Sequence, residues 1–313
     1  MVIEKNSLKM ERVIQGLMRL NTLDEKKLYE LIKYDIEHGV HFFDISDIYG
    51  RSAAETKLGN VLKEHPELRS EMIIQSKCGI IKEDNDVNYY DLSYKHIVDS
   101  CYASLKRLNI DYIDYYLLHR PDIFMNAHEV AQAISELKIS GKVKHFGVSN
   151  FPHEMVKYLY DQTNIPIEIN QLQLGLGHLD LVREVLNCNM NNNEGCEHTG
   201  ELFFYMKRYN ISLQCWSPFQ IDFFEGSIFT DERYKKTNEV LDRLANKYHA
   251  SKCAIATAFL LNLGDNIQVI TGSTDPKHVQ ETIDGKEIIL TKPEWYELYR
   301  STGNMLPWFY IAW

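Results

Sequence analysis

Residues 40–50 read VHFFDISDIYG, an apolar run of β type that ends in an acid, Asp44, and leads into a short polar stretch containing Tyr49. Two similar runs follow along the chain. The run Met72–Lys77 (MIIQSK) ends in a lysine, and the run 112–119 (YIDYYLLH) ends in a histidine. Because segments of helical periodicity separate these runs, the pattern predicts parallel strands joined by helices, with the strand ends gathered on one face.

The same alternation extends over most of the chain. The candidate strands are Arg12–Gln15, Gly39–Ile45, Met72–Lys77, Asp111–Leu118, His145–Val148, Ile167–Gln173, Ser212–Trp216 and Gln268–Ile270. The candidate helices are Asp24–Glu37, Ser93–Leu108, Glu129–Ser140, Pro152–Tyr160 and Glu239–Tyr248. Eight β-then-α units predict a (β/α)₈ TIM barrel, formed as a single domain over residues 1–313. A doubly wound sheet is the rival fold, but the chain lacks the GxGxxG loop that usually follows its first strand.

The composition excludes several classes of protein. Lys and Arg number 34 against 44 Asp and Glu, a net charge of −10, so no basic surplus exists to bind nucleic acid. The charged amino terminus does not resemble a signal peptide. The longest apolar run, Cys253–Leu261, is far shorter than the roughly 20 residues of a membrane-spanning helix. We therefore expect a cytoplasmic protein that binds neither nucleic acid nor membrane.

Four ionisable side chains of different type fall at or just after consecutive strand ends: Asp44, Tyr49, Lys77 and His119. Taken singly, each has an ordinary structural interpretation, such as a helix cap or a packed residue. At one rim of one barrel they form a working acid. Asp44 can hold Lys77 charged, Lys77 can favour the phenolate of Tyr49 and lower its pKa, and His119 can orient the proton. Such a group can protonate a carbonyl oxygen while hydride reaches the carbon.

These residues lie in segments that together resemble the aldo-keto reductase family. Phe43–Gly50 (FDISDIYG) stands in place of the family pattern FDTAxxYG. Further along the chain come segments similar to the family's GVSN, NQ, YSP and GSTxPxH: GVSN at 147–150, NQ at 170–171, WSP at 216–218 and GSTDPKH at 272–278. The resemblance runs in order from about residue 10 to 305. It implies a nicotinamide-dependent reductase with Asp44, Tyr49, Lys77 and His119 as its catalytic tetrad.

The resemblance also implies a cofactor site. Ser149, Asn150 and Gln171 would offer polar groups to the nicotinamide carboxamide, and Trp216 a flat face for the ring. The positions implied to border the cofactor further out are Ser217, Pro218, Gly272, Ser273, Thr274, Lys277, His278, Glu281 and Thr282. The segment Gly272–Thr274 opens a helix whose amides can receive phosphate.

Asp275 departs from the pattern, because relatives often carry a basic residue there that can help to bind a 2′-phosphate. An acid at this position would repel that phosphate, whereas Ser273, Lys277 and His278 could still attract it. We therefore expect NADP as the cofactor, with NAD as the alternative.

Two segments stand apart from the barrel pattern. Residues 187–200 (NCNMNNNEGCEHTG) read as a polar loop insertion, and residues 304–313 form an aromatic tail. Cys188, Cys196 and His198 lie in the loop, but their spacing fits no common zinc site, so we expect no metal. The tail could close over a substrate or pack against outer helices.

The sequence thus predicts a reductase that converts an aldehyde or ketone to an alcohol, with Tyr49 as the general acid and a small carbonyl compound as the substrate. It leaves the identity of that compound and the oligomeric state open. One alternative is a cofactor-binding sensor or regulatory subunit with slow turnover. Another is a Schiff-base aldolase with Lys77 as the nucleophile, in which the GVSN, NQ and GST segments would have no purpose.

Overall fold

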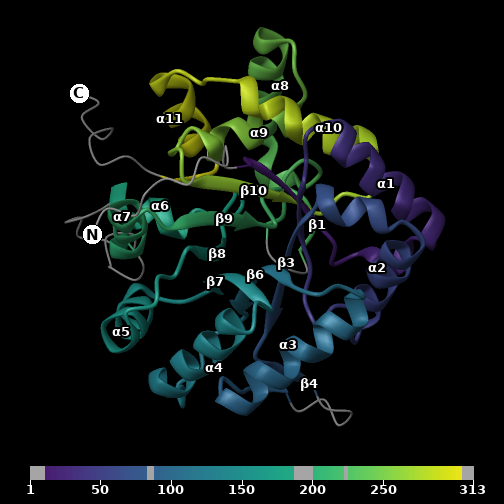
Figure 1. The fold of residues 1–313 in the computed structure, drawn as a ribbon. Coiled ribbons are helices and arrows are strands. Elements are labelled where there is room, and N and C mark those ends of the chain that lie inside the picture. Colours follow the sequence, from purple (N-terminus) through teal and green to yellow (C-terminus); the bar gives the residue numbers. More distant parts are fainter. Residues whose placement is uncertain (1–10, 83–87, 187–199, 222–224, 305–313) are drawn as a thin grey trace.

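Eight parallel strands close into a barrel in the order β1-β10-β9-β8-β7-β6-β3-β2 (Figure 1). The structure is a computed structural model that describes residues 11–82, 88–186, 200–221 and 225–304. The barrel strands are β1 (Val13–Gly16), β2 (Phe42–Asp44), β3 (Ile73–Cys78), β6 (Ile113–Leu118), β7 (Val143–Ser149), β8 (Ile169–Gln173), β9 (Ser212–Trp216) and β10 (Ile267–Thr271). The predicted (β/α)₈ barrel is therefore confirmed, and each of the eight predicted runs overlaps one barrel strand.

Helices surround this barrel (Figure 1). They are α1 (Glu25–Glu37), α2 (Ala53–Glu64), α3 (Tyr94–Leu108), α4 (Ala127–Ile139), α5 (His153–Thr163), α6 (Asp180–Leu186), α7 (Gly200–Tyr209), α8 (Lys235–Tyr248), α9 (Lys252–Leu261), α10 (Pro276–Asp284) and α11 (Lys292–Ser301). The apolar run Cys253–Leu261 forms nearly all of α9 and is buried throughout, which explains its length and composition. None of the helices in the described ranges is both long and apolar enough to cross a membrane.

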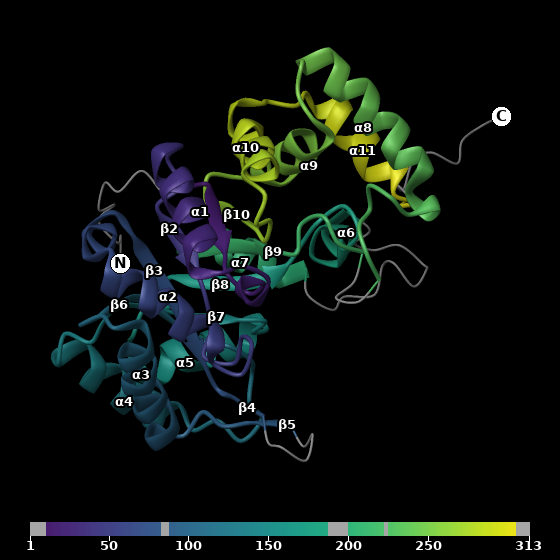
Figure 2. The same cartoon turned by 90° about the vertical axis from the view of Figure 1, so that its right-hand side faces the viewer.

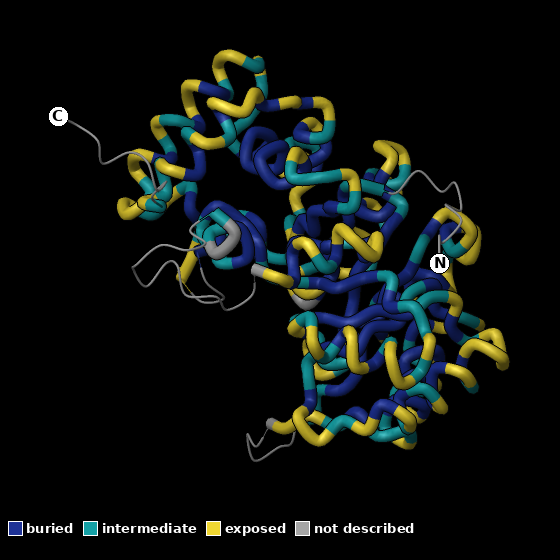
Figure 3. Tube along the Cα trace, turned by 90° about the vertical axis from the view of Figure 1, so that its left-hand side faces the viewer, coloured by how far each residue is buried: buried dark blue, intermediate teal, exposed yellow. Residues whose placement is uncertain are grey.

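Local sequence signals set several helix ends. The side chain of Ser93 accepts a hydrogen bond from the backbone of His96, so the predicted cap of α3 is confirmed. Asp24 caps α1 in the same way. Helix α3 then turns its buried residues Ile97, Cys101 and Leu105 inward at helical spacing. In Figure 3 the buried residues gather along the barrel and the inner faces of the helices.

A two-stranded antiparallel sheet follows β3 and was not predicted from the sequence. It pairs β4 (Ile80–Lys82) with β5 (Asn88–Tyr90), just before α3 in the chain, and is visible in Figure 2. Strands of three residues are too short to show an alternating pattern. The predicted loop 187–200 falls largely outside the described residues, as do Cys188, Cys196 and His198. Most of the aromatic tail, residues 305–313, lies outside them as well.

Candidate active site

Asp44 and Lys77 come from neighbouring strands and meet at the carboxyl end of the barrel. The Nζ of Lys77 lies 2.7 Å from Oδ1 and 2.8 Å from Oδ2 of Asp44, and it donates a further hydrogen bond of 2.8 Å to the carbonyl of Ile45. Lys77 is fully buried. Burial alone would lower its pKa, but Asp44 and Tyr49 outweigh that effect and raise the pKa above its usual value. The side chain therefore stays an ammonium.

Tyr49 lies on the loop after β2 and is half-buried. Its hydroxyl accepts a hydrogen bond of 3.2 Å from Nζ of Lys77. Burial raises the pKa of Tyr49, and Lys77 opposes this only in part because Asp44 raises it further. The sequence predicts that Lys77 lowers this pKa. The lysine does act in that direction, but the net pKa lies above its ordinary value because the phenolate would be desolvated. Tyr49 is therefore a protonated phenol at neutral pH.

His119 follows β6 and completes the group of four. Its ring meets that of Tyr49 edge-on, with the centroids 6.0 Å apart. Burial lowers the pKa of His119 well below its usual value, and Lys77 and Arg120 lower it further. The imidazole is therefore neutral. Its Nδ1 lies 3.0 Å from the Oγ of Ser46, which leaves Nε2 as the nitrogen available to a ligand.

Buried glutamines in the barrel interior donate hydrogen bonds to Asp44. The Nε2 of Gln75 lies 2.6 Å from Oδ1 of Asp44, and that of Gln171 lies 3.0 Å from the same oxygen. Both amides also donate to Oε1 of Gln214, and Nε2 of Gln214 in turn donates to Oε1 of Gln268. A continuous chain of side-chain hydrogen bonds thus runs down the barrel interior from the carboxylate, and it holds Asp44 in one orientation.

Ser149, Asn150, Gln171 and Trp216 lie together at the ends of β7, β8 and β9. The amide of Asn150 donates to Oγ of Ser149 at 2.8 Å and accepts from the indole of Trp216 at 3.3 Å, and Ser149 donates to the carbonyl of Gln171. Asn150 and Ser217 both adopt left-handed backbone conformations, with φ of 61° and 48°. Residues other than glycine rarely do so, and such positions concentrate at functional sites.

Two amide side chains at the end of β8 each have a hydrogen-bonding group available to a ligand. Gln171 uses both protons of Nε2 on Asp44 and Gln214, so its side chain can offer a ligand only the acceptor Oε1. Gln173 faces Trp216 in the pairing of β8 with β9. Its Nε2 is buried and has no hydrogen-bond partner among the described residues. An acceptor and a donor beside an aromatic ring fit a carboxamide-bearing ring such as nicotinamide.

The segment after β10 leads into α10. A Cβ on Gly272 would meet open space, and the carbonyl of Ser273 accepts a hydrogen bond from Gln15 at 3.0 Å. Asp275 is the N-cap of α10, and its carboxylate accepts from the backbone of Lys277 at 2.9 Å. The remaining predicted positions here are exposed or half-buried: Ser273, Thr274, Lys277, His278 and Glu281. An open helix start with a nearby lysine fits an anionic group.

Thr282 lies elsewhere. Its side chain is fully buried, donates to the carbonyl of His278 and contacts Sγ of Cys253 on α9. The side chain therefore lies in the packing between α9 and α10 and is not open to a ligand.

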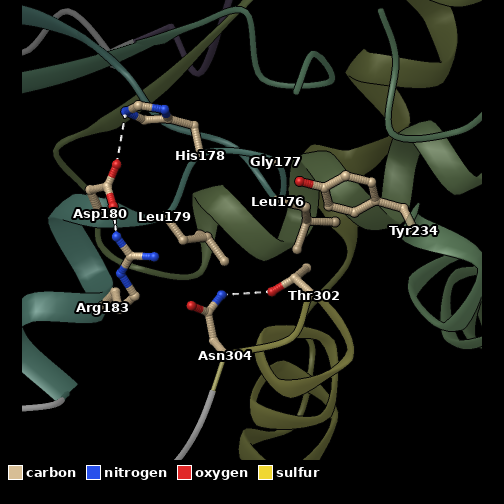
Figure 4. Close-up of a pocket in the computed structure, with 9 residues that line it drawn as sticks. All are labelled: Leu176, Gly177, His178, Leu179, Asp180, Arg183, Tyr234, Thr302 and Asn304. Atoms are coloured by element: carbon tan, nitrogen blue, oxygen red, sulfur yellow. Dashed lines mark hydrogen bonds and ion pairs between the residues drawn. The ribbon is translucent and has the colours of Figure 1, made fainter. Parts of the chain in front are cut away.

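A separate cavity of about 290 Å³ lies between the segment that joins β8 to α6 and the end of α11 (Figure 4). It is lined by Leu176, Gly177, His178, Leu179, Asp180, Arg183, Tyr234, Thr302 and Asn304. Its charged side chains are paired, because Asp180 contacts both His178 and Arg183 (Figure 4). None of the four tetrad residues lines it.

Several residues within the site were not predicted from the sequence. Ser46, Asp47, Gln75 and Gln214 were not assigned a role, although Gln75 lies two residues before Lys77 and Gln214 two before Trp216. The two-residue period of a strand places such pairs on one face, and this signal could have identified both glutamines.

Comparisons with known proteins agree with this geometry. The model of the aldo/keto reductase family matches residues 12–300. An uncharacterized oxidoreductase from Bacillus subtilis, YcsN, is 30% identical over 302 residues, which cover 93% of this chain and 94% of that protein. A 6-dehydroglucose reductase from Agrobacterium fabrum is 29% identical and covers 94% and 95%. An aldo/keto reductase from Klebsiella pneumoniae, crystallised with NADP and acetate, superposes with a TM-score of 0.72 at 18% identity over 92% and 90% of the two chains.

The family model covers most of the chain, and the solved structure from Klebsiella pneumoniae has the same fold. The chain therefore belongs to the aldo/keto reductase family.

Proposed function

We propose that this protein reduces an aldehyde or ketone to an alcohol, using hydride that bound NADPH supplies. The observation that carries the proposal is the fully buried Nζ of Lys77, which lies within hydrogen-bonding distance of both Asp44 and Tyr49. A buried ammonium held by one carboxylate can stabilise a phenolate that forms beside it. This is the arrangement that a tyrosine needs to give up a proton.

Tyr49 is the general acid in this mechanism. Burial keeps its pKa high, so the phenol is protonated before reaction. As negative charge develops on the carbonyl oxygen, Tyr49 transfers its proton to that oxygen and becomes a phenolate. Lys77, held by Asp44, stabilises the phenolate until solvent returns the proton. The neutral His119 orients the carbonyl oxygen through Nε2.

The rim residues would hold the cofactor. Gln171 would accept from the carboxamide through Oε1, Asn150 and Ser149 would border the same group, and Trp216 would stack on the ring. The start of α10, with Ser273, Lys277 and His278, would receive the ribose phosphate, and Asp275 would oppose it. A solved structure of the same fold contains NADP, which is compatible with NADP as the cofactor of this chain.

The substrate class follows from the relatives only in outline. A 29% identical relative bears the name 6-dehydroglucose reductase. A sugar that carries a carbonyl group away from the anomeric centre therefore belongs in the first substrate panel, beside simple aldehydes and ketones.

The test is NADPH oxidation at 340 nm with this panel, using wild type and Tyr49→Phe. We expect turnover by wild type and a loss of kcat of about 10²–10⁴-fold in the variant, as for a lost general acid, with NADPH affinity nearly unchanged. A variant that keeps most of the reductase rate would exclude Tyr49 as the acid. Tight NADPH binding with background rates across the panel would instead favour the sensor.

A further inference from the structure

Ser46 contacts the imidazole ring of His119. Its Oγ is 3.0 Å from Nδ1 of His119 and 3.1 Å from Oδ1 of Asp47, and it accepts a longer contact of 3.5 Å from the backbone N–H of Ile48. Ser46 is fully buried, so no bulk water competes for these contacts. The hydroxyl therefore links a carboxyl group to the imidazole.

A serine hydroxyl has one proton and two acceptor lone pairs. The contact from Ile48 is long, and its N–H is shared with the carboxylate of Asp47. The short contacts of Ser46 are those with Asp47 and His119, so its proton and one lone pair are divided between these two partners. Because His119 is neutral, its ring carries one N–H, on either Nδ1 or Nε2. Whichever partner receives the proton of Ser46 thus decides which nitrogen of His119 is protonated.

We propose that Ser46 sets the tautomer of His119 according to the charge on Asp47. When Asp47 is ionised, it accepts from Ser46, Ser46 accepts from Nδ1–H, and Nε2 is a bare acceptor. When Asp47 is protonated, it donates to Ser46, Ser46 donates to Nδ1, and Nε2 carries the proton. The change between the two states releases one proton to solvent, from Asp47, and moves the ring proton of His119 from Nε2 to Nδ1.

Asp47 lies where it can titrate. Burial raises its pKa to about 7, and Glu55 on α2 raises it too, whereas Ser46 and Arg107 on α3 lower it. Arg107 does not neutralise Asp47 directly, because its Nε is bound to Glu55 at 2.7 Å. The switch is therefore centred near neutral pH.

The other titratable groups around this pair hold one charge state. Lys77 on β3 remains an ammonium. The thiol of Cys78 on β3 and the hydroxyl of Tyr116 on β6 are buried, and burial raises the pKa of both groups well above their usual values. Tyr49 stays protonated for the same reason. Of these side chains, Asp47 is the one whose pKa lies near neutral pH.

The consequence for catalysis rests on the proposed reductase function: the two tautomers of His119 favour opposite directions of the reaction. A protonated Nε2 donates a hydrogen bond to the carbonyl oxygen and assists reduction. A bare Nε2 accepts from an alcohol and assists oxidation. Ser46 is thus a positioning residue, and it occupies the alanine position of the family pattern FDTAxxYG. Ser46→Ala restores that residue and removes only the hydroxyl.

The direct test is ¹⁵N NMR of histidine-labelled protein, in which the shifts of the two ring nitrogens report the tautomer. His119 is assigned by its absence in His119→Gln. We expect Nε2–H in wild type at pH 5.5 and Nδ1–H at pH 8.5. Asp47→Asn should hold Nε2–H at both values, because its amide can donate to Ser46. This readout requires no turnover, so it tests the tautomer even where the proposed reductase activity fails.

Ser46→Ala should remove the pH dependence of the tautomer, and Ser46→Thr should restore it. The matched control is Ser100→Ala, which removes the contact of Ser100 with His96 on α3 and should leave His119 unchanged. In kinetics, Ser46→Ala should lower kcat for reduction at pH 6 by about 5- to 10-fold, as for one lost hydrogen bond, and raise it at pH 8.5, because the variant no longer holds Nε2 as a bare acceptor. One tautomer at both pH values in wild type, or the same pH dependence in Ser46→Ala, would overturn the proposal.

Discussion

Gln75 and Asp44 are direct neighbours in the parallel pairing of β2 with β3, and Nε2 of Gln75 lies 2.6 Å from Oδ1 of Asp44. The opposite orientation of the amide would turn its oxygen toward two acceptors, Asp44 and Gln214. The Oε1 of Gln75 is meanwhile buried and has no hydrogen-bond partner in the described part of the chain. Gln75 thus stabilises the carboxylate of Asp44, while its own Oε1 loses hydration without gaining a hydrogen bond.

This arrangement predicts a large effect on activity and a small one on stability for Gln75→Met, which keeps the volume and removes the amide. We expect kcat to fall about 10-fold, because a hydrogen bond to a charged group is lost. The free energy of unfolding should change by less than about 1 kcal/mol, because the unpartnered Oε1 is removed as well. NADPH-dependent kinetics and urea unfolding measure the two quantities.

Gln268→Met is the matched control. Gln268 is buried in the same chain of amides, but it contacts Gln214 and the backbone of Glu11 rather than Asp44. We expect its kcat to stay close to wild type. An equal loss of activity in both variants would mean that the glutamines act through general packing.

Lys77 and Asp44 should behave as one unit. Lys77→Met removes the ammonium that stabilises the phenolate of Tyr49, so we expect a loss of kcat of about 10²-fold or more. Asp44→Asn acts through Lys77 and should have a similar or smaller effect. Because the residues are in contact, the double variant should be little worse than Lys77→Met. Losses that multiply in the double variant would show that the two residues work separately.

The sequence predicts the features that depend on residue spacing, but not the contacts that depend on how neighbouring strands are aligned. The two-residue and helical periods predicted all eight barrel strands, and the strand ends predicted the meeting of Asp44, Lys77 and His119. The contact of Gln75 with Asp44 arises from the alignment of β2 with β3, which no single segment encodes. For Tyr49, the sequence shows the neighbouring charge of Lys77, which does lower the pKa, but not the burial that outweighs it.

Asp35 predicts a pH dependence of stability outside the site. The residue is fully buried on α1, and within the described ranges neither carboxylate oxygen has a hydrogen-bond partner. Burial raises its pKa to about 8 from an ordinary value of 3.8. The folded state thus keeps a proton that the unfolded state loses, so this residue's contribution to stability falls as pH rises from about 4 to 8.

Asp35→Asn removes that titration. Between pH 5 and pH 7 the free energy of unfolding of wild type should fall relative to the variant, by about 1.4 kcal/mol per pH unit at most. Urea unfolding of both proteins at each pH measures the difference and cancels the effect of other titrating groups. Parallel pH curves for the two proteins would show that Asp35 has a partner in the folded state.

Asp275 has two expected effects: it opposes the 2′-phosphate that distinguishes NADPH from NADH, and it caps α10. As the N-cap of α10, its carboxylate accepts from the backbone of Lys277, so a change to arginine would remove a negative charge and a helix cap together. Asp275→Asn separates the two effects, because asparagine caps as well as aspartate does. If Asp275 opposes the 2′-phosphate, Asp275→Asn should tighten NADPH about 3-fold, as expected for one exposed like charge, and leave NADH unchanged. Asp275→Arg should tighten NADPH further but lower the melting temperature.

The control is Asp284→Asn, which removes the same charge at the other end of α10. Fluorescence titration of both cofactors decides the outcome, and an equal effect of Asp275→Asn on NADPH and NADH would place residue 275 away from the ribose.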